Sequence, residues 1–325
     1  MRDLQALPKA HLHLHLEAGM RPSTLVDQAE RYGIDVPAIT GFGSFTEFSG
    51  MYLAACQVLQ RPEDFARVID EIVEDARQQG ATYIEPSFYA PRYSSFPGAT
   101  EGVVEMVLDQ LGASAARHGV AARLMLAADR TMDPSDAVEQ AKIAVRFADR
   151  GIVAFGLAND EALWPPEPFA EAFAIAKEGG LLSTPHAGEL AGPESVRGAL
   201  DTLHADRVQH GVRAIEDPEL VKRLADEGVC CDVCPTSNVL LAIVPTMEAS
   251  ALGPLLDAGV PCSVNADDPL LFGPGLLEEY EVCRTELGFD DARMAHIARC
   301  SIEHSGAPAD VKASALSGVD AWLAS

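Results

Sequence analysis

The sequence predicts a (β/α)8 barrel formed by the whole chain, residues 1–325, as a single domain. Short apolar runs alternate with longer helical patterns almost throughout, the runs number eight, and no repeat, low-complexity block or linker divides them. Strand–helix alternation favours parallel pairing. Eight repetitions favour a closed barrel over the alternative, an open doubly wound sheet. The first run also lacks the glycine-rich phosphate turn that is typical of many open sheets.

The expected elements follow one another in a regular order. The runs expected as strands are His11–Leu16, Thr82–Phe88, Ala122–Ala127, Ile152–Leu157, Leu181–Ala187, Arg207–Gly211, Val229–Cys234 and Pro261–Ala266. The stretches between them expected as helices are Arg61–Gln79, Glu101–His118, Pro134–Arg150, Glu167–Glu178, Pro193–Leu203, Pro218–Glu227 and Met247–Ala258. Two further helical patterns after the first strand, Pro22–Tyr32 and Thr46–Leu59, predict an insertion over the barrel mouth. The stretch Asp290–Ser325 predicts extra C-terminal helices outside the barrel.

The charge balance limits the classes of partner. Lys and Arg number 24 against 49 Asp and Glu, which gives a net charge of −25. A chain this acidic lacks the excess positive charge that attracts nucleic acid or an anionic membrane. No apolar stretch approaches the roughly 18 residues that span a bilayer, and no signal peptide is recognisable. We therefore expect a cytoplasmic protein; whether it has a protein partner is not predictable from the sequence.

The seven cysteines do not predict a disulfide framework, because their number is odd and their spacings are irregular. Cys231 and Cys234 form a C-x-x-C within a strand-like run, where residues three apart face opposite sides. No second C-x-x-C completes a zinc site. We expect the cysteines to be small buried residues.

Reactive side chains gather at the ends of the predicted strands. Barrel enzymes place their chemistry at the C-terminal ends of their strands. The residues that stand there are His13 and His15 on the first strand, His186 and Glu189 at the fifth, His210 at the sixth, and Asp267 and Asp268 after the eighth. This placement predicts one site at the barrel mouth.

Part of this set predicts a metal centre. His13 and His15 are two residues apart on a strand, so both face the same side. Together with His186 and Asp267 they form a set of three nitrogens and one oxygen, which suits zinc. His11 shares their face but lies deeper, where a packing layer is expected, although spacing alone leaves a His11–His13 ligand pair open.

The fourth strand bears on the number of metals. Binuclear barrel hydrolases commonly bridge their two metals with a carboxylated lysine at the end of that strand. The run Ile152–Leu157 and the residues that follow it contain no lysine. The sequence therefore favours a single metal ion.

Several blocks resemble the adenosine deaminase family of metal-dependent hydrolases, which includes adenosine, adenine and aminofutalosine deaminases. In chain order the blocks are Leu7–Pro22, Ala154–Glu161, His186–Glu189, Val208–Gly211, Val233–Asn238 and Asn265–Pro269. The resemblance spans nearly the whole chain, and the blocks are highly specific in combination. The amino-acid sequences of Phe155–Glu161 and of the C-terminal stretch Gly318–Leu323 are most similar to those of actinobacterial members.

The resemblance implies a role for each residue at the strand ends. The implied reaction is the zinc-dependent hydrolytic deamination of a 6-aminopurine. One Zn²⁺ per chain, held by His13, His15, His186 and Asp267, would activate a water molecule for attack on C6. His210 would orient that water, and Glu189, with a raised pKa, would supply a proton to N1. Asp268 would hydrogen-bond N7 of this small-molecule purine substrate.

Four departures from the family pattern fall near the implied substrate. Ala18 and Gly19 replace the usual Gly followed by a small residue. Glu17 stands where adenosine deaminases usually have an Asp that contacts the ribose 5′-hydroxyl. Asn159 replaces a Gly whose backbone normally approaches N3. The second strand, Glu85–Pro91, lacks the usual Arg and carries an extra residue.

The sequence leaves the substrate open because these departures lie away from the implied metal. Adenosine or 2′-deoxyadenosine, converted to inosine or 2′-deoxyinosine plus ammonia, is the first expectation. Adenine or aminodeoxyfutalosine on the same scaffold is the alternative. A different mononuclear metal hydrolase, such as an amidase or lactonase, is less favoured, and so is a catalytically silent purine-binding protein.

Overall fold

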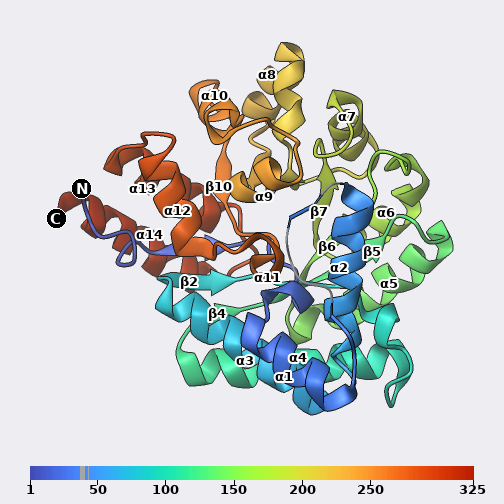
Figure 1. Ribbon diagram of the computed structural model, residues 1–325. Coiled ribbons are helices and arrows are strands. Elements are labelled where there is room, and N and C mark those ends of the chain that lie inside the picture. The colour runs from blue at the N-terminus through green and yellow to red at the C-terminus, as the bar shows by residue number, and fades with distance from the viewer. Residues whose placement is uncertain (37–40, 43) are drawn as a thin grey trace.

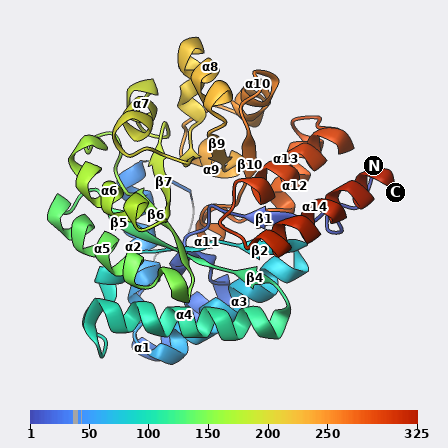
Figure 2. The same ribbon diagram turned by 180° about the vertical axis from the view of Figure 1, so that it is seen from behind.

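Parallel strands alternate with surrounding helices along the chain (Figures 1 and 2). The computed structural model describes residues 1–36, 41–42 and 44–325. The strands are β1 Lys9–His11, β2 Ala81–Ile84, β3 Ser87–Phe88, β4 Ala121–Ala122, β5 Leu124–Asp129, β6 Ile152–Ala158, β7 Leu182–Ala187, β8 Arg207–His210, β9 Cys230–Val233 and β10 Cys262–Val264. The helices are α1 Pro22–Tyr32, α2 Phe45–Gln57, α3 Pro62–Gln78, α4 Ala99–His118, α5 Pro134–Arg146, α6 Ala170–Glu178, α7 Pro193–Thr202, α8 Pro218–Glu227, α9 Pro235–Leu240, α10 Leu252–Asp257, α11 Pro269–Phe272, α12 Leu276–Thr285, α13 Asp291–Glu303 and α14 Ala309–Ala324.

The strands form the predicted barrel in two linked ladders. One parallel ladder runs β10-β9-β8-β7-β6-β5-β3, and the other runs β1-β2-β4. Parallel bridges from Leu14 to Asp267 and from His15 to Ser87 join the first barrel strand to β10 and β3 at the mouth. The segments β2 and β3 share one barrel position, as do β4 and β5, so the fold is the (β/α)8 barrel that the sequence predicts.

The first barrel strand differs from the predicted run His11–Leu16, because regular pairing ends at His11. The side-chain Oδ1 of Asn265 accepts hydrogen bonds from the backbone N–H groups of Leu12 (2.7 Å) and His13 (3.1 Å). A side chain therefore takes the place of a backbone carbonyl in the ladder at this point. Beyond it the chain pairs again through isolated bridges at the barrel mouth.

The predicted insertion after the first strand is present as α1 and α2. Helix α2 lies across the barrel mouth in Figure 1. It is capped by Ser44, whose hydroxyl accepts a hydrogen bond from the backbone of Glu47 (3.2 Å). Phe48 of α2 stacks on Phe272 of α11, with ring centroids 5.3 Å apart. The insertion is thus anchored to the opposite side of the mouth.

The helices α13 and α14 pack outside the barrel, as the sequence predicts for Asp290–Ser325, and they are preceded by α12, which was not predicted. The indole of Trp322 in α14 donates a hydrogen bond to the backbone of Asp3 (2.6 Å), and Arg2 pairs with Asp291 (3.2 Å). The two ends of the chain therefore lie side by side (Figures 1 and 2). The short helices α9 and α11 were not predicted; each begins at a proline shortly after a strand end.

A closed ionic network fills the barrel interior below the mouth. The guanidinium of Arg207 contacts Glu85 (2.7 Å), Asp232 (2.9 Å) and the backbone carbonyl of His304 (2.8 Å). Ser263 donates a further hydrogen bond to Asp232 (2.7 Å). Arg207, Glu85 and Asp232 are all fully buried, so their charges are balanced within the protein rather than by solvent.

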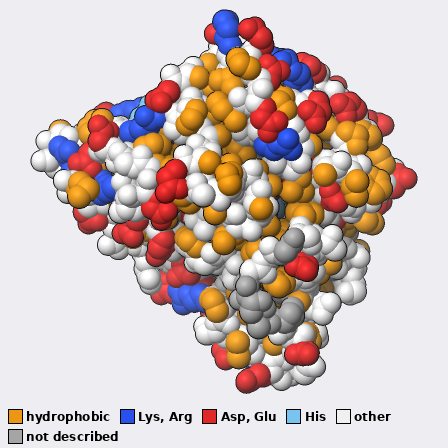
Figure 3. Space-filling view, turned by 45° about the horizontal axis from the view of Figure 1, so that its top comes forward, with side chains coloured by type: hydrophobic (Ala, Val, Ile, Leu, Met, Phe, Trp, Pro, Cys, Tyr) orange, Lys and Arg blue, Asp and Glu red, His pale blue; other side chains and the backbone are white. Residues whose placement is uncertain are grey.

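The surface and the cysteines match the sequence expectations. Figure 3 shows acidic side chains distributed over the face in view, with basic side chains between them. All seven cysteines are free and buried. Among the residues that the structure describes, no helix is both long and apolar enough to cross a membrane.

Candidate metal centre and active site

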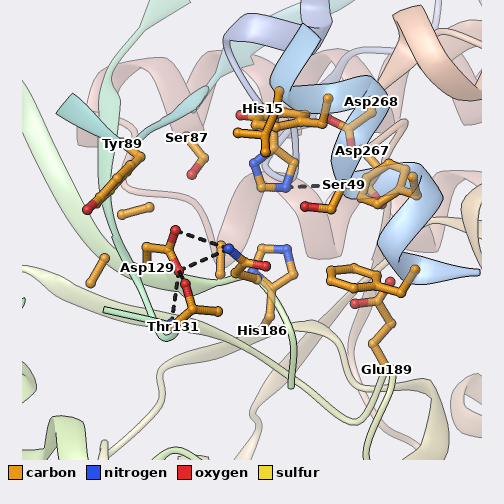
Figure 4. Close-up of a pocket in the computed structure, with 18 of the residues that line it drawn as sticks. His15, Ser49, Ser87, Tyr89, Asp129, Thr131, His186, Glu189, Asp267 and Asp268 are labelled. Carbon is orange, nitrogen blue, oxygen red and sulfur yellow. Dashed lines mark hydrogen bonds and ion pairs between the residues drawn. The ribbon is translucent and has the colours of Figure 1, made fainter. Parts of the chain in front are cut away.

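The strand-end residues lie around one cavity at the barrel mouth (Figure 4). The cavity has a volume of about 260 Å³. The members of the predicted set that line it are His15, His186, Glu189, His210, Asp267 and Asp268, together with Asn159. His13 lies directly beneath and is fully buried. The fold thus brings together side chains that are more than 250 positions apart in the sequence.

Four side chains place ligand atoms close together. The Nε2 of His13 lies 3.1 Å from Nε2 of His186 and 3.3 Å from Oδ1 of Asp267. The Nε2 of His15 is 3.3 Å from the same Oδ1. Tetrahedral zinc with bonds of about 2.0–2.1 Å holds its ligand atoms roughly 3.3 Å apart. The separations of His13 from His186 and Asp267, and of His15 from Asp267, match this spacing, and the ligand atom of His15 groups most closely with those of Asp267 and Asp268.

Hydrogen bonds to the opposite ring nitrogens orient two of these histidines. The Nδ1 of His13 donates to the backbone carbonyl of Asp232 (3.2 Å), and the Nδ1 of His186 donates to that of Leu157 (3.0 Å). A neutral imidazole whose Nδ1 carries the proton presents a lone pair at Nε2. The two rings thus direct their Nε2 atoms toward each other, and that of His13 also toward Asp267.

His210 has the opposite tautomer. Its Nδ1 accepts a hydrogen bond from the side-chain amide of Asn238 (3.1 Å), so the proton resides on Nε2. That Nε2 lies 3.5 Å from Glu189 and 3.7 Å from Asp267. Distances alone would group His210 with His13, His186 and Asp267 as ligands. A protonated Nε2 cannot bind a metal, so the hydrogen bonding favours His210 as a donor beside the centre.

His11 lies in the layer below the ligands, where the sequence analysis expected packing. Its Nε2 accepts a hydrogen bond from the backbone N–H of Ala266 (3.1 Å). Burial lowers the pKa of His11 to about 3, so the ring is neutral and able to accept that bond. With Nε2 engaged in this way, the geometry does not favour a ligand pair of His11 and His13.

The carboxyl groups of the site differ in protonation. Burial raises the pKa of Glu189 well above its usual range, and the charges of Asp267 and Glu161 raise it further. Burial also raises the pKa of Asp268 well above its usual range. Burial acts in the same direction on Asp267, but His13 and the other histidines hold the pKa of Asp267 well below the usual range. The site therefore combines one ionised carboxylate with two carboxyl groups that can donate a proton.

Asp268 is poised toward the cavity. Its side chain lines the cavity and is buried, and its Oδ1 has no hydrogen-bond partner among the residues that the structure describes. A buried polar atom without a partner costs free energy, of the order of 1–3 kcal/mol. A ligand in the cavity would supply the missing contact.

Glu17 lies behind the cavity wall rather than on it. It is fully buried, and its Oε2 accepts a hydrogen bond from the hydroxyl of Tyr52 in α2 (2.9 Å). Tyr52 lines the cavity, and its ring packs against His15 with centroids 5.9 Å apart. At this point the wall is therefore an aromatic ring from the insertion.

Asn159 lines the cavity, but its polar side-chain atoms have partners in the protein. Its amide nitrogen donates to both carboxylate oxygens of Asp129 (3.0 Å each), and its carbonyl oxygen accepts from the backbone of Asp160 (2.9 Å). Its φ of 85° is a left-handed conformation, which Asn tolerates better than most residues. Asn159 thus holds Asp129 in place at the cavity edge.

Several cavity residues were not singled out from the sequence. They are Phe45, Phe48 and Tyr52 of α2, Arg92 after β3, and Asp129 and Thr131 at the end of β5, whereas Ser87 and Tyr89 belong to the segment Glu85–Pro91 that the sequence placed near the substrate. The aromatic residues of α2 recur at helical spacing, which could have revealed an apolar face turned toward the mouth. Arg92 could not be placed, because it follows the predicted second strand in a short 3-10 turn, with its guanidinium 5.6 Å from the ring of Tyr89.

Comparisons with known proteins agree with this arrangement. A family model described as adenosine deaminase matches residues 8–322. A Streptomyces virginiae protein, provisionally named adenosine/adenine deaminase, is 45% identical over 99% of this chain and 98% of its own. The crystal structure of adenine deaminase from Arthrobacter aurescens matches with a TM-score of 0.92 and 32% identity, covering 98% of this chain and 100% of that one.

A second similar structure carries a metal. It is an amidohydrolase from Burkholderia ambifaria with bound zinc, which matches with a TM-score of 0.86 and 26% identity over 99% of this chain and 94% of that one. The family model covers nearly all of the chain, and the relatives that align over almost their full length are deaminases. The chain belongs to the adenosine deaminase family and is a deaminase hydrolase.

Proposed function

We propose that this protein catalyses the zinc-dependent hydrolytic deamination of a 6-aminopurine to the 6-oxopurine and ammonia. The observation that carries the proposal is the convergence, at one cavity, of a three-nitrogen, one-oxygen ligand set with a neutral carboxyl group at Glu189 and an Nε2-protonated His210. A ligand set alone fits many hydrolases. The adjacent proton donor and hydrogen-bond donor are what a purine ring needs when water adds to it.

His13, His15, His186 and Asp267 would hold one zinc ion per chain. Zinc bound there supplies Lewis acidity, which lowers the pKa of a water molecule to about 7. The donor set matches the spacing of tetrahedral zinc, and the bonds from His13 and His186 to backbone carbonyls keep those two rings in the ligating tautomer. Asp267 contributes the negative charge that a divalent cation requires.

The remaining residues handle protons and the purine. The Nε2–H of His210 would orient the attacking water. As its oxygen adds to C6, electron density moves onto N1, and Glu189 would deliver a proton there so that no negative charge builds up. The bond from C6 to the amino nitrogen then breaks, ammonia leaves with one proton of the water, and the other proton of the water returns to Glu189. Asp268, neutral and without a partner at Oδ1, would donate a hydrogen bond to N7.

Adenosine and 2′-deoxyadenosine are the first candidate substrates. Adenine is a second candidate, and a specific observation favours it. Glu17, at the position of the carboxylate that would contact the ribose 5′-hydroxyl, is bonded to Tyr52 and does not line the cavity. The similarity to an adenine deaminase of Arthrobacter aurescens also supports adenine as the substrate.

We expect an assay with adenosine, 2′-deoxyadenosine, adenine and aminodeoxyfutalosine to show loss of the 6-aminopurine absorbance together with ammonia release. A high kcat/KM for adenine over adenosine would assign the free base, and the reverse would assign the nucleoside. If the zinc-loaded protein releases ammonia from none of these compounds, the proposed function is wrong.

Removal of the metal is expected to abolish deamination and to lower Tm, because the buried Asp267 would lose the cation that balances its charge. Dialysis against a chelator, metal analysis and a thermal melt measure this directly. Re-addition of zinc should restore both activity and Tm. Two metals per chain at full activity would contradict the mononuclear centre and would favour a different class of hydrolase.

A further inference from the structure

A buried glutamate outside the catalytic set holds the segment that carries Glu189. Glu161 follows β6 and is 2% exposed. Its Oε1 accepts a hydrogen bond from the backbone N–H of Gly188 (2.5 Å). Its Oε2 accepts three more, from the backbone N–H groups of Glu189 (2.9 Å), Leu190 (2.8 Å) and Ala191 (3.1 Å). Four consecutive N–H groups thus converge on one carboxylate.

The held segment follows β7 directly. His186, a metal-ligand candidate, is the last but one residue of that strand, and Glu189, the candidate proton donor, comes three residues later. The side chain of Glu189 lines the cavity, whereas its backbone N–H is bound to Glu161 (Figure 4 shows the cavity side). Glu161 therefore holds this residue by its backbone and leaves its carboxyl group free for the cavity.

A buried arginine anchors the other end of the segment. Arg130 follows β5 and is fully buried. It donates hydrogen bonds to the backbone carbonyls of His186 (2.6 Å) and Trp164 (2.9 Å). It is also a cation close enough to offset the charge of Glu161 electrostatically. The stretch 186–191 is thus held by charged side chains from the two preceding strand ends.

We propose that Glu161 is a positioning residue for the deamination, one that sets the distance between the carboxyl group of Glu189 and the metal centre. This inference rests on the proposed function. Proton transfer requires the donor within hydrogen-bond reach, and a misplacement of about 1 Å can cost roughly 100-fold in rate. A loop without regular secondary structure does not by itself hold a side chain that accurately. The four N–H contacts to one rigidly buried carboxylate supply the restraint.

The restraint depends on the carboxylate and not merely on the volume of the side chain. An ionised carboxylate offers acceptors at both oxygens, which matches four N–H donors. The amide of Gln has the same shape but replaces one oxygen with an NH₂ group, which would face a backbone N–H donor. Glu161→Gln therefore keeps the packing of the region but removes at least the hydrogen bond from the backbone N–H of Gly188, because a donor then faces a donor.

The test compares Glu161→Gln with wild type in the zinc-loaded protein. We expect kcat to fall about 100-fold while KM and the zinc content stay within twofold of wild type, because neither the ligands nor the purine contacts are altered. Hydrogen exchange read by mass spectrometry should show faster exchange of the amides of 188–191. Glu161→Asp keeps the charge but shortens the side chain, so its kcat should lie between those of wild type and Glu161→Gln.

Asp64→Asn is the matched control, because Asp64 is also a buried carboxylate that accepts backbone N–H groups, those of Gln60 (3.0 Å) and Arg61 (2.9 Å), away from the cavity. It should lower Tm with kcat unchanged. Equal kcat for Glu161→Gln and wild type would overturn the inference, as would a loss of activity that merely follows a loss of zinc. If wild type deaminates no 6-aminopurine, the proposed function itself fails, which is a distinguishable result.

Discussion

Replacement of Glu189 by Gln is expected to lower kcat by about 10³-fold, within the range that a positioned proton donor contributes. The amide retains the shape and hydrogen-bonding capacity of the side chain but has no acidic proton to give to N1. Burial and the nearby charge of Asp267 keep the carboxyl group of Glu189 protonated, which is the state that the reaction uses. KM should change little, since the cavity wall is preserved. Steady-state kinetics on the zinc-loaded variant measures both parameters.

Glu194→Gln is the control for this variant, because Glu194 follows five residues later, is exposed and does not line the cavity. It should behave as wild type. Metal analysis of both variants separates loss of proton donation from loss of zinc. Deamination by Glu189→Gln at the wild-type rate would show that another group protonates the ring, and the adjacent neutral carboxyl of Asp268 would then be the first alternative.

Much of the barrel and of its candidate metal site could be predicted because the necessary information is local. Each strand is a short apolar run, and each helix between them repeats an apolar face, so the alternation is readable without knowledge of contacts. The barrel architecture then places every strand end at one mouth. This rule alone brings His13, His186 and Asp267 together from positions far apart, and the measured separations of 3.1–3.3 Å match that expectation.

The features that could not be predicted depend on partners distant in the sequence. Regular pairing of the first strand ends early because Asn265, more than 250 residues away, inserts its side chain at Leu12. Glu17 was expected at the substrate, but Tyr52 from the insertion covers it and bonds to it. Asn159 lines the cavity as expected, but its hydrogen bonds to Asp129 and Asp160 could not be predicted. No periodic pattern encodes such contacts.

The helical insertion also explains why the substrate is harder to infer than the chemistry. The metal ligands and proton donors come from strand ends, whose positions the barrel determines. The wall opposite them comes from Phe45, Phe48 and Tyr52 of α2 and from Arg92 in a turn. The strand ladder does not constrain these elements. Substitutions in them can therefore change which substrate the cavity accepts while the reaction stays the same.

The second large effect is expected in stability, at the ionic network beneath the centre. Arg207→Met should destabilise the protein by about 3–5 kcal/mol, because it leaves the carboxylates of Glu85 and Asp232 buried without the cation that contacts both of them. Met occupies a similar volume, so the change removes charge rather than creating a large cavity. For a chain of this length such a loss corresponds to a fall in Tm of about 5 °C. Thermal and denaturant unfolding of the zinc-loaded protein measure it.

Arg67→Met is the matched control, since Arg67 also pairs with two carboxylates, Asp27 (2.8 Å) and Glu71 (3.0 Å), but is 36% exposed. Surface pairs of this kind contribute about 0–1 kcal/mol, so its Tm should change by little more than a degree. Equal effects of the two variants would show that the Arg207 network is stabilised by packing and not by charge. Because the backbone carbonyl of Asp232 also accepts the hydrogen bond of His13, Arg207→Met should weaken zinc binding as well, whereas Arg67→Met should not.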